Sequence, residues 1–167
     1  MLFTNLLLAT LATLSAAEVA LESSPSVGVF SFAEWIEGII QNPDGDNLTP
    51  EEAYAAWELS VNQTELSGHD AVTCANYLAD KGRRGINCRA NTYTIMCDHR
   101  TAKIFGGAGN GVSDTTSNCN DVARAVGFIL DRCSRNDGMV QGSDFAYGNG
   151  NFQIQIRNAQ HCGSLYR

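Results

Sequence analysis

The chain has 167 residues, of which 44% are hydrophobic and 17% charged, and its net charge is -7. This length suits one modest domain with additional segments and excludes two full hydrophobic cores. Residues 1–84 carry twelve acids and three bases, a net charge of -9, whereas residues 85–167 carry eight bases and six acids, a net charge of +2. A nucleic-acid-binding surface would need a basic stripe with interleaved aromatic residues, and a charge of +2 spread over 83 residues is not that, so no nucleic-acid partner is expected.

The N-terminus is typical of a secretory signal peptide over residues 1–17, with an apolar middle and small residues at its end. Ser15 and Ala17 suit the third and first positions before the cut, so we expect cleavage after Ala17 and an extracellular protein. Two N-glycosylation sequons, at Asn47 and Asn62, fit the same compartment. No later segment has the roughly 18 apolar residues of a membrane span, so no stable membrane insertion is expected.

The cysteines number six, which is even, and in a secreted protein they favour three disulfides. Cys97 lies close to His99, and His161 precedes Cys162, but no CxxC zinc motif occurs. The acids at 44–52 lack the Gly and Glu positions of a calcium loop. We therefore expect neither a metal nor a cofactor. The disulfides are predicted to use Cys74, Cys88, Cys97, Cys119, Cys133 and Cys162.

The region after the signal peptide, residues 18–84, is predicted to be acidic and helical. Apolar residues three and four apart predict a first helix over Val29–Ile40. The sequence Thr49-Pro50-Glu51-Glu52 supplies an N-cap, a proline at the first helical position and a capping-box glutamate. A second helix should therefore run to about Ser60, and a third is expected over about His69–Lys81.

A dibasic sequence separates this acidic region from the rest of the chain. Lys81-Gly82-Arg83-Arg84 is similar to a kexin-type processing site. Cleavage after it would make residues 18–84 a propeptide and release a domain over residues 85–167. The downstream part holds only five of the six cysteines, so Cys74 would keep the two fragments joined if it forms a disulfide across the cut.

Downstream of Arg84, alternating apolar residues predict short strands, and a Gly-rich run predicts a loop. The clearest helix covers Ser117–Cys133, with apolar residues repeating every three or four positions. At 1.5 Å per residue, its Cys119 and Cys133 lie roughly 21 Å apart, too far to pair, so each must bond to another element. The expected strands are about 92–97, 101–104, 139–147 (interrupted by Gly142) and 152–156, and the loop is 106–111.

The residues downstream of Arg84 offer little for catalysis. Glycoside hydrolysis requires two carboxylates that face one cleft. His99 and His161 would be the acid and base of a ribonuclease, although a lone surface histidine is the commoner case. No GxSxG motif occurs. A small secreted hydrolase of glycan or RNA is thus an alternative, with carboxylates drawn from Asp98, Asp114, Asp121, Asp131, Asp137 and Asp144.

Several short stretches, in the same order along the chain, resemble one family of secreted proteins. Residues 85–89, GINCR, resemble the start of a mature toxin, and Cys97 is followed by Arg100-Thr101-Ala102-Lys103-Ile104 as in that family. Residues 117–119 then lead into a helix, and residues 142–144 precede a closing strand and Cys162. Over residues 85–167 the chain therefore resembles the virus-encoded killer toxins of smut fungi, of the killer protein four type, and their relatives among secreted fungal proteins.

The resemblance implies a fold and an activity. The fold is α+β, an α/β sandwich in which an antiparallel sheet of about five strands has helices packed on one face. The implied activity is that of a non-enzymatic toxin that perturbs calcium uptake, with a target-cell surface protein such as a calcium channel as partner. Lys103 matches the lysine important for that activity, and Arg100 precedes it in the same motif.

Alternation along the chain independently places Lys103 opposite Ala102 and Ile104, on the solvent face of a strand. A compact cation there could engage acidic groups at a channel mouth. The alternative is a lysine that is merely solvated or protects a sheet edge.

The resemblance also implies a disulfide pattern. It pairs Cys88 with Cys133 and Cys97 with Cys119, which leaves Cys74 with Cys162. We therefore expect a secreted, monomeric, killer-toxin-like protein, antifungal or host-directed, that acts by binding. A hydrolase and a non-catalytic cysteine-rich binding module are the alternatives.

Overall fold

Four helices and six strands make up the described part of the chain, residues 28–61, 68–135 and 137–157 of a computed structural model. The fold is α+β, as predicted, with antiparallel sheets. In order, the elements are α1 (Phe32–Gln41), α2 (Pro50–Val61), α3 (His69–Arg83), β1 (Asn87–Ala90), β2 (Thr94–His99), β3 (Ala102–Ala108), β4 (Thr115–Asn118), α4 (Cys119–Cys133), β5 (Gly142–Phe145) and β6 (Phe152–Arg157).

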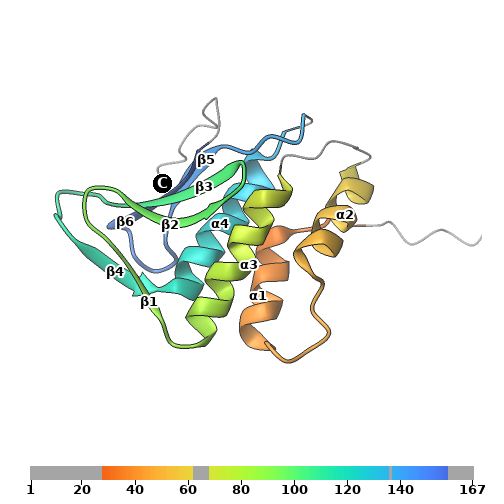
Figure 1. Cartoon of the computed structure of the whole chain (residues 1–167), viewed down its shortest axis with the longest axis horizontal. Coiled ribbons are helices and arrows are strands. Elements are labelled where there is room, and N and C mark those ends of the chain that lie inside the picture. The colour runs from red at the N-terminus through yellow and green to blue at the C-terminus, as the bar shows by residue number, and fades with distance from the viewer. Residues whose placement is uncertain (1–27, 62–67, 136, 158–167) are drawn as a thin grey trace, which may run out of the picture.

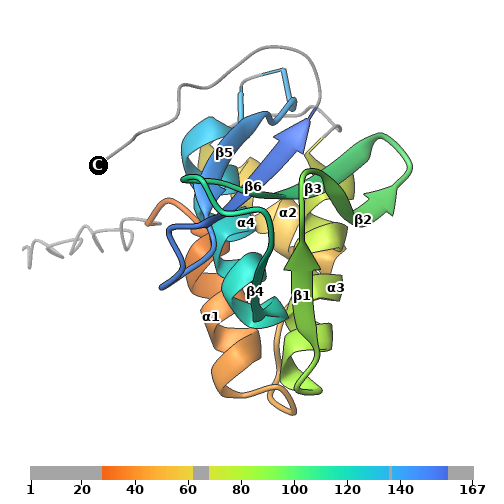
Figure 2. The same cartoon turned by 90° about the vertical axis from the view of Figure 1, so that its left-hand side faces the viewer.

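The helices lie on one face of a four-stranded sheet with strand order β2-β3-β6-β5 (Figures 1 and 2). Helix α3 packs against β2 and β3, and α4 packs against β5 and β6. Helix α1 packs on α3 and α4, and α2 packs on α3. The strands contribute alternate residues to this core, including Ile104, Ile154 and Ile156, which are all buried. The other face of the sheet points away from the helices.

Helices α1 and α4 approach closely where they cross. A Cβ on Gly127 of α4 would lie 2.9 Å from the Cα of Ala33, so glycine is required at this crossing. At the start of α1, the Asp131 carboxylate of α4 accepts hydrogen bonds from the backbone N–H groups of Phe32 (2.6 Å) and Ala33 (3.1 Å). These N–H groups have no partner within a helix, and a carboxylate suits the positive end of the helix dipole. The two contacts fix α1 against α4.

The predicted starts of α2 and α3 are confirmed, whereas α1 begins at Phe32, three residues later than expected. At the start of α2, the Glu52 N–H donates to the Thr49 hydroxyl (3.2 Å) and the Thr49 N–H donates to the Glu52 carboxylate (2.9 Å), which is a capping box. Helix α4 begins two residues later than expected, with Asn118 as its N-cap.

Two predictions about the strands are corrected. The short pair β1 and β4 was not expected, and it forms a separate two-stranded antiparallel sheet. The Gly-rich run starting at Gly106 was expected to be a loop, yet β3 continues through it to Ala108. A Cβ on Gly106 would lie 2.5 Å from both Met96 and Phe152, so glycine here makes room for core side chains.

The disulfide pattern implied by the resemblance is wrong at both of its explicit pairs. Cys88 bonds to Cys119, with Cα atoms 5.0 Å apart, because β1 pairs with β4 and places Cys88 opposite Ser117, next to the start of α4. Cys97 bonds to Cys74, with Cα atoms 5.7 Å apart, because α3 packs against β2.

The inferred pair of Cys74 with Cys162 is therefore wrong as well. Cys133 is also disulfide-bonded, and Cys162 lies outside the described residues. The expectation that each end of the helix carrying Cys119 and Cys133 is held by a disulfide to another residue is confirmed.

The residues on both sides of Arg84 share one hydrophobic core. It includes Phe32, Trp35 and Leu78 from the upstream helices together with Ile104 and Val126 from the downstream part. Among the described helices, none is both long enough and apolar enough to cross a membrane.

Candidate functional site

The outward face of the four-stranded sheet carries the predicted functional lysine. Lys103 is 48% exposed, between the buried residues Ala102 and Ile104, as the alternation predicted. Its neighbours across the sheet are Asp98 on β2 and Arg157 on β6. The Lys103 Nζ lies 2.9 Å from the Asp98 carboxylate. Lys103 is therefore an accessible cation in a row of three charged residues.

An aromatic cluster adjoins this row. The Arg157 guanidinium lies 4.6 Å from the centre of the Tyr93 ring and 5.2 Å from that of Phe105. The two rings meet edge to face at 5.8 Å. The Tyr93 hydroxyl donates to the Gln155 side chain (2.7 Å). We call Tyr93, Ile95, Lys103, Phe105 and Arg157 the outward cluster; Ile95 is 53% exposed and pairs with Phe105.

Arg100 lies in the turn between β2 and β3, where its φ of 46° is in the left-handed region. The next residue, Thr101, anchors this turn to helix α3. Its N–H and its hydroxyl both donate to the Asp70 carboxylate, at 3.1 and 2.6 Å. The structure thus places Arg100 at the end of the hairpin that carries Lys103, and not among the residues of the outward cluster.

Asp70 is the carboxylate that holds the turn of this hairpin, and it is only 8% exposed. Burial alone would raise the pKa of its carboxyl group. The two hydrogen bonds from Thr101 and the charges of His99 and Arg100 outweigh burial and lower that pKa below its ordinary value. The imidazoles of His69 and His99 lie 3.9 and 3.8 Å from its second oxygen.

A group whose pKa is lowered in the folded state stabilises the fold above its ordinary pKa, and this contribution is lost as the pH falls through the lowered value. We expect the Asp70→Asn variant to be less stable than the native chain by about 1–2 kcal/mol at pH 7, because a charged acceptor becomes neutral. The difference should shrink below about pH 4. Urea denaturation of both proteins from pH 2 to 7 measures it.

The matched control for this pH dependence is Asp98→Asn, at a half-exposed carboxylate whose surface ion pair with Lys103 contributes at most about 1 kcal/mol. A constant difference between the native chain and Asp70→Asn across this pH range would contradict the prediction.

The aspartates considered for hydrolysis each have partners. Lys103 pairs with Asp98, Arg89 with Asp114 (2.8 Å), and Arg124 with Asp121 (2.9 Å). Arg132 and Arg135 pair with Asp144 and Asp137, and Asp131 caps helix α1. His99 lies beside Asp70, and His161 lies outside the described residues. Among the described residues, no group of three or more His, Cys, Asp or Glu side chains could hold a metal ion.

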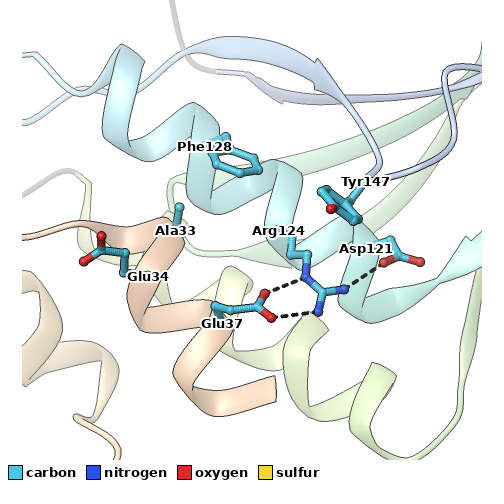
Figure 3. Close-up of a pocket in the computed structure, with 7 residues that line it drawn as sticks. All are labelled: Ala33, Glu34, Glu37, Asp121, Arg124, Phe128 and Tyr147. Atoms are coloured by element: carbon cyan, nitrogen blue, oxygen red, sulfur yellow. Dashed lines mark hydrogen bonds and ion pairs between the residues drawn. The ribbon is translucent and has the colours of Figure 1, made fainter. Parts of the chain in front are cut away.

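A cavity of about 390 Å³ lies between α1 and α4, on the side of α4 away from the core. In Figure 3, the Arg124 guanidinium lies between Glu37 and Asp121. The aromatic rings drawn near it are those of Phe128 and Tyr147. We call this the α1–α4 cavity; it is lined by Ala33, Glu34, Glu37, Asp121, Arg124, Phe128 and Tyr147. Sequence reasoning did not find it, because Glu37 and Arg124 are far apart in the chain.

The predicted processing site lies at the end of α3. Arg83 is the last helical residue, and both Arg83 and Arg84 form ion pairs with Asp80 (2.6 and 2.9 Å). Proteolysis acts on locally opened backbone, so cleavage after Arg84 would require the last turn of α3 to unwind. Cleavage stays a prediction. The Cys74–Cys97 disulfide would hold the two fragments together, as anticipated for Cys74.

Of the predicted glycosylation and signal-cleavage sites, only Asn47 lies within the described residues. The side-chain amide of Asn47 donates to the backbone oxygens of Asn42 (2.7 Å) and Gly45 (3.3 Å). Asn62 and Ala17 lie outside the described residues, so glycosylation and signal cleavage stay predictions.

The fold and these surfaces define a small, disulfide-bonded α+β protein with an accessible sheet face. A family model described as "Domain of unknown function (DUF8794)" matches residues 56–158, more than half of the chain, and the chain belongs to this family. The match runs across Arg84. No curated protein and no solved structure matches the chain.

Proposed function

We propose that the chain is a secreted, killer-toxin-like protein that acts by binding a target-cell surface protein through the outward face of its four-stranded sheet. The observation that carries this proposal is the position of Lys103. It is exposed on the face that none of the described helices covers, beside the Arg157, Tyr93 and Phe105 cluster. Tyrosine and arginine are among the residues enriched at the positions that dominate binding energy at interfaces.

The ion pair of Lys103 with Asp98 does not prevent such binding. Both side chains are about half exposed, and an exposed ion pair contributes roughly 0–1 kcal/mol. Lys103 can therefore exchange Asp98 for an acidic group on a partner at little cost. The resemblance to killer toxins adds a calcium channel as the expected partner and reduced calcium uptake as the expected effect, in a fungal or host cell.

Binding is a better proposal than catalysis for this surface. Each aspartate that a hydrolase would draw on already has an arginine, lysine or backbone N–H partner. Asp121 shares a cavity with Glu37, but Arg124 bonds to both carboxylates, so this pair is not a free acid and base.

The test is growth inhibition of a sensitive fungus or plant cell by the purified protein, with and without added calcium. We expect Lys103→Gln to lose at least about tenfold in potency, the loss of roughly 1.4 kcal/mol of binding free energy, and Lys103→Arg to retain more of it. Added calcium should relieve inhibition by the native chain. Thermal unfolding should be nearly unchanged in Lys103→Gln, because the ion pair is on the surface.

Arg89→Gln is the matched control, since Arg89 is an exposed cation on β1 of the two-stranded sheet and pairs with Asp114. It should keep full potency. Full potency of Lys103→Gln would remove Lys103 from the site. Turnover of glycan or RNA that survives Lys103→Gln but not His99→Ala would favour the hydrolase instead.

A further inference from the structure

The α1–α4 cavity has a charge that selects its ligand. Glu34, Glu37 and Asp121 contribute three carboxylates and Arg124 one guanidinium, so the lining has a net charge of -2. The Glu34 carboxylate has no ion-pair partner among the described residues. Arg132, which contacts the Phe128 ring, forms an ion pair with Asp144 (3.1 Å). The cavity therefore favours a cation.

Arg124 does not make the cavity an anion site. Its Nε and one terminal nitrogen bond to the Glu37 carboxylate at 2.6 and 3.1 Å, and its other terminal nitrogen bonds to Asp121 at 2.9 Å (Figure 3). The hydrogen bond from Arg124 lowers the pKa of Glu37, so this carboxylate stays ionised. Together the three side chains form a fixed wall whose net charge is negative.

Aromatic rings form the other wall of the cavity, and these rings already attract cations. The Arg124 guanidinium lies 5.4 Å from the centre of the Tyr147 ring, and that of Arg132 lies 5.2 Å from the centre of Phe128. Tyr147 is 62% exposed, so much of its ring remains available. The faces of aromatic rings bind ammonium and guanidinium groups by their quadrupole.

We propose that the α1–α4 cavity binds a basic side chain, lysine or arginine, of a partner protein. The alkyl part of such a side chain packs on Ala33 and the aromatic rings, and its charged end reaches the Glu34 carboxylate. Charge complementarity and the apolar walls together match this amphipathic shape. The site is built from α1, α4 and the segment after β5, so it does not depend on the sheet face that carries Lys103.

The probe is the blocked peptide acetyl-Gly-Gly-Lys-Gly-Gly-amide, titrated into the full disulfide-bonded chain labelled with ¹⁵N. We expect chemical-shift changes centred on the amides of residues 34, 128 and 147. The same peptide with an acetylated lysine, which has no charge, should bind at least about tenfold more weakly. Raising the salt concentration should weaken binding, because the site is partly exposed.

Two variants test the Glu34 carboxylate and the aromatic wall. Glu34→Gln should weaken binding of the lysine peptide about two- to fivefold, the range of one exposed ion pair. Tyr147→Ala should weaken it about two- to fivefold, the range of an exposed cation–π contact. The controls are Asp46→Asn, at an exposed acid elsewhere, and Tyr77→Ala, at an exposed tyrosine that stacks with Lys81 (5.3 Å) outside this cavity. Both controls should bind as the native chain does.

Three outcomes would overturn the proposal. Equal binding of the charged and acetylated peptides would remove the role of charge, and shifts centred elsewhere would remove the cavity. Binding of spermidine at least about tenfold tighter than the peptide, with shifts at residues 34, 128 and 147, would make the ligand a free polyamine instead of a protein side chain.

Discussion

Replacing Cys74 and Cys97 together by alanine should lower the free energy of unfolding by about 3 kcal/mol. The two cysteines lie 23 residues apart in sequence. On the chain-entropy model, the disulfide lowers the conformational entropy of the unfolded chain and so raises its free energy by about 3–4 kcal/mol. This is a large fraction of the roughly 5–15 kcal/mol that separates the folded from the unfolded state of a typical domain. Urea denaturation under non-reducing conditions measures the loss.

The second disulfide provides a matched comparison. Cys88 and Cys119 lie 31 residues apart, so replacing both by alanine should cost nearly the same in free energy. The two pairs differ in what they hold. Cys88–Cys119 joins β1, which is already paired with β4, to the start of α4, whereas Cys74–Cys97 joins the edge strand β2 to α3.

Amide hydrogen exchange distinguishes the two variants. Loss of Cys74–Cys97 should speed exchange in β2 well beyond its effect on β5 and β6, because this disulfide holds the edge strand β2 to α3 and does not involve β5, the other edge strand, or β6. Loss of Cys88–Cys119 should leave β2 close to its native rate. Equal protection of β2 in the two variants would contradict the proposed role of Cys74–Cys97.

Exchange in β2 bears directly on the proposed function. Asp98, the ion-pair partner of Lys103, lies in β2, and the turn after β2 is held to α3 through Thr101 and Asp70. One disulfide and one buried carboxylate thus fix the hairpin that carries Lys103. Both contacts come from α3, which lies upstream of the predicted cleavage point.

Local sequence patterns predicted the elements whose cause is local. The capping box at Thr49 and Glu52 needs only residues three apart, and the exposure of Lys103 follows from the alternation along one strand. The same alternation along β6 places Arg157 outward, so its exposure on this face could be predicted from the sequence. Pairing Arg157 with Tyr93 required knowing which strands are neighbours.

Contacts between distant segments could not be predicted. Strands β1 and β4 have the sequences NCRA and TTSN, which are too short and too polar to show a hydrophobic period. Without the pairing of β1 with β4, no sequence pattern indicates that Cys88 lies close to Cys119. The disulfide pattern could therefore be predicted only from the resemblance. Glu37 and Arg124 are 87 residues apart, and only the packing of α1 on α4 brings them together in one cavity.

Replacing Gly82 by alanine should destabilise the chain by about 2 kcal/mol, although helix propensity alone predicts a gain of up to about 1 kcal/mol. Gly82 is buried in the last turn of α3, against the start of α4. A Cβ on it would lie 2.5 Å from Asn120 Cγ and would also overlap the Asn120 backbone nitrogen. Backbone cannot rotate away as a flexible side chain can, so α3 and α4 would have to separate.

Gly38 of α1 is the matched control, because it too is a helical glycine but has room for a side chain. A Cβ on Gly38 would meet only the Asn47 side-chain oxygen, at 3.6 Å, which is an ordinary contact. Gly38→Ala should therefore stabilise the chain by about 0.5–1 kcal/mol. Urea denaturation of both variants should give changes of opposite sign. If Gly82→Ala were stabilising as well, α3 and α4 would not approach at Gly82 as closely as described, and the shared core across Arg84 would lose one of its main contacts.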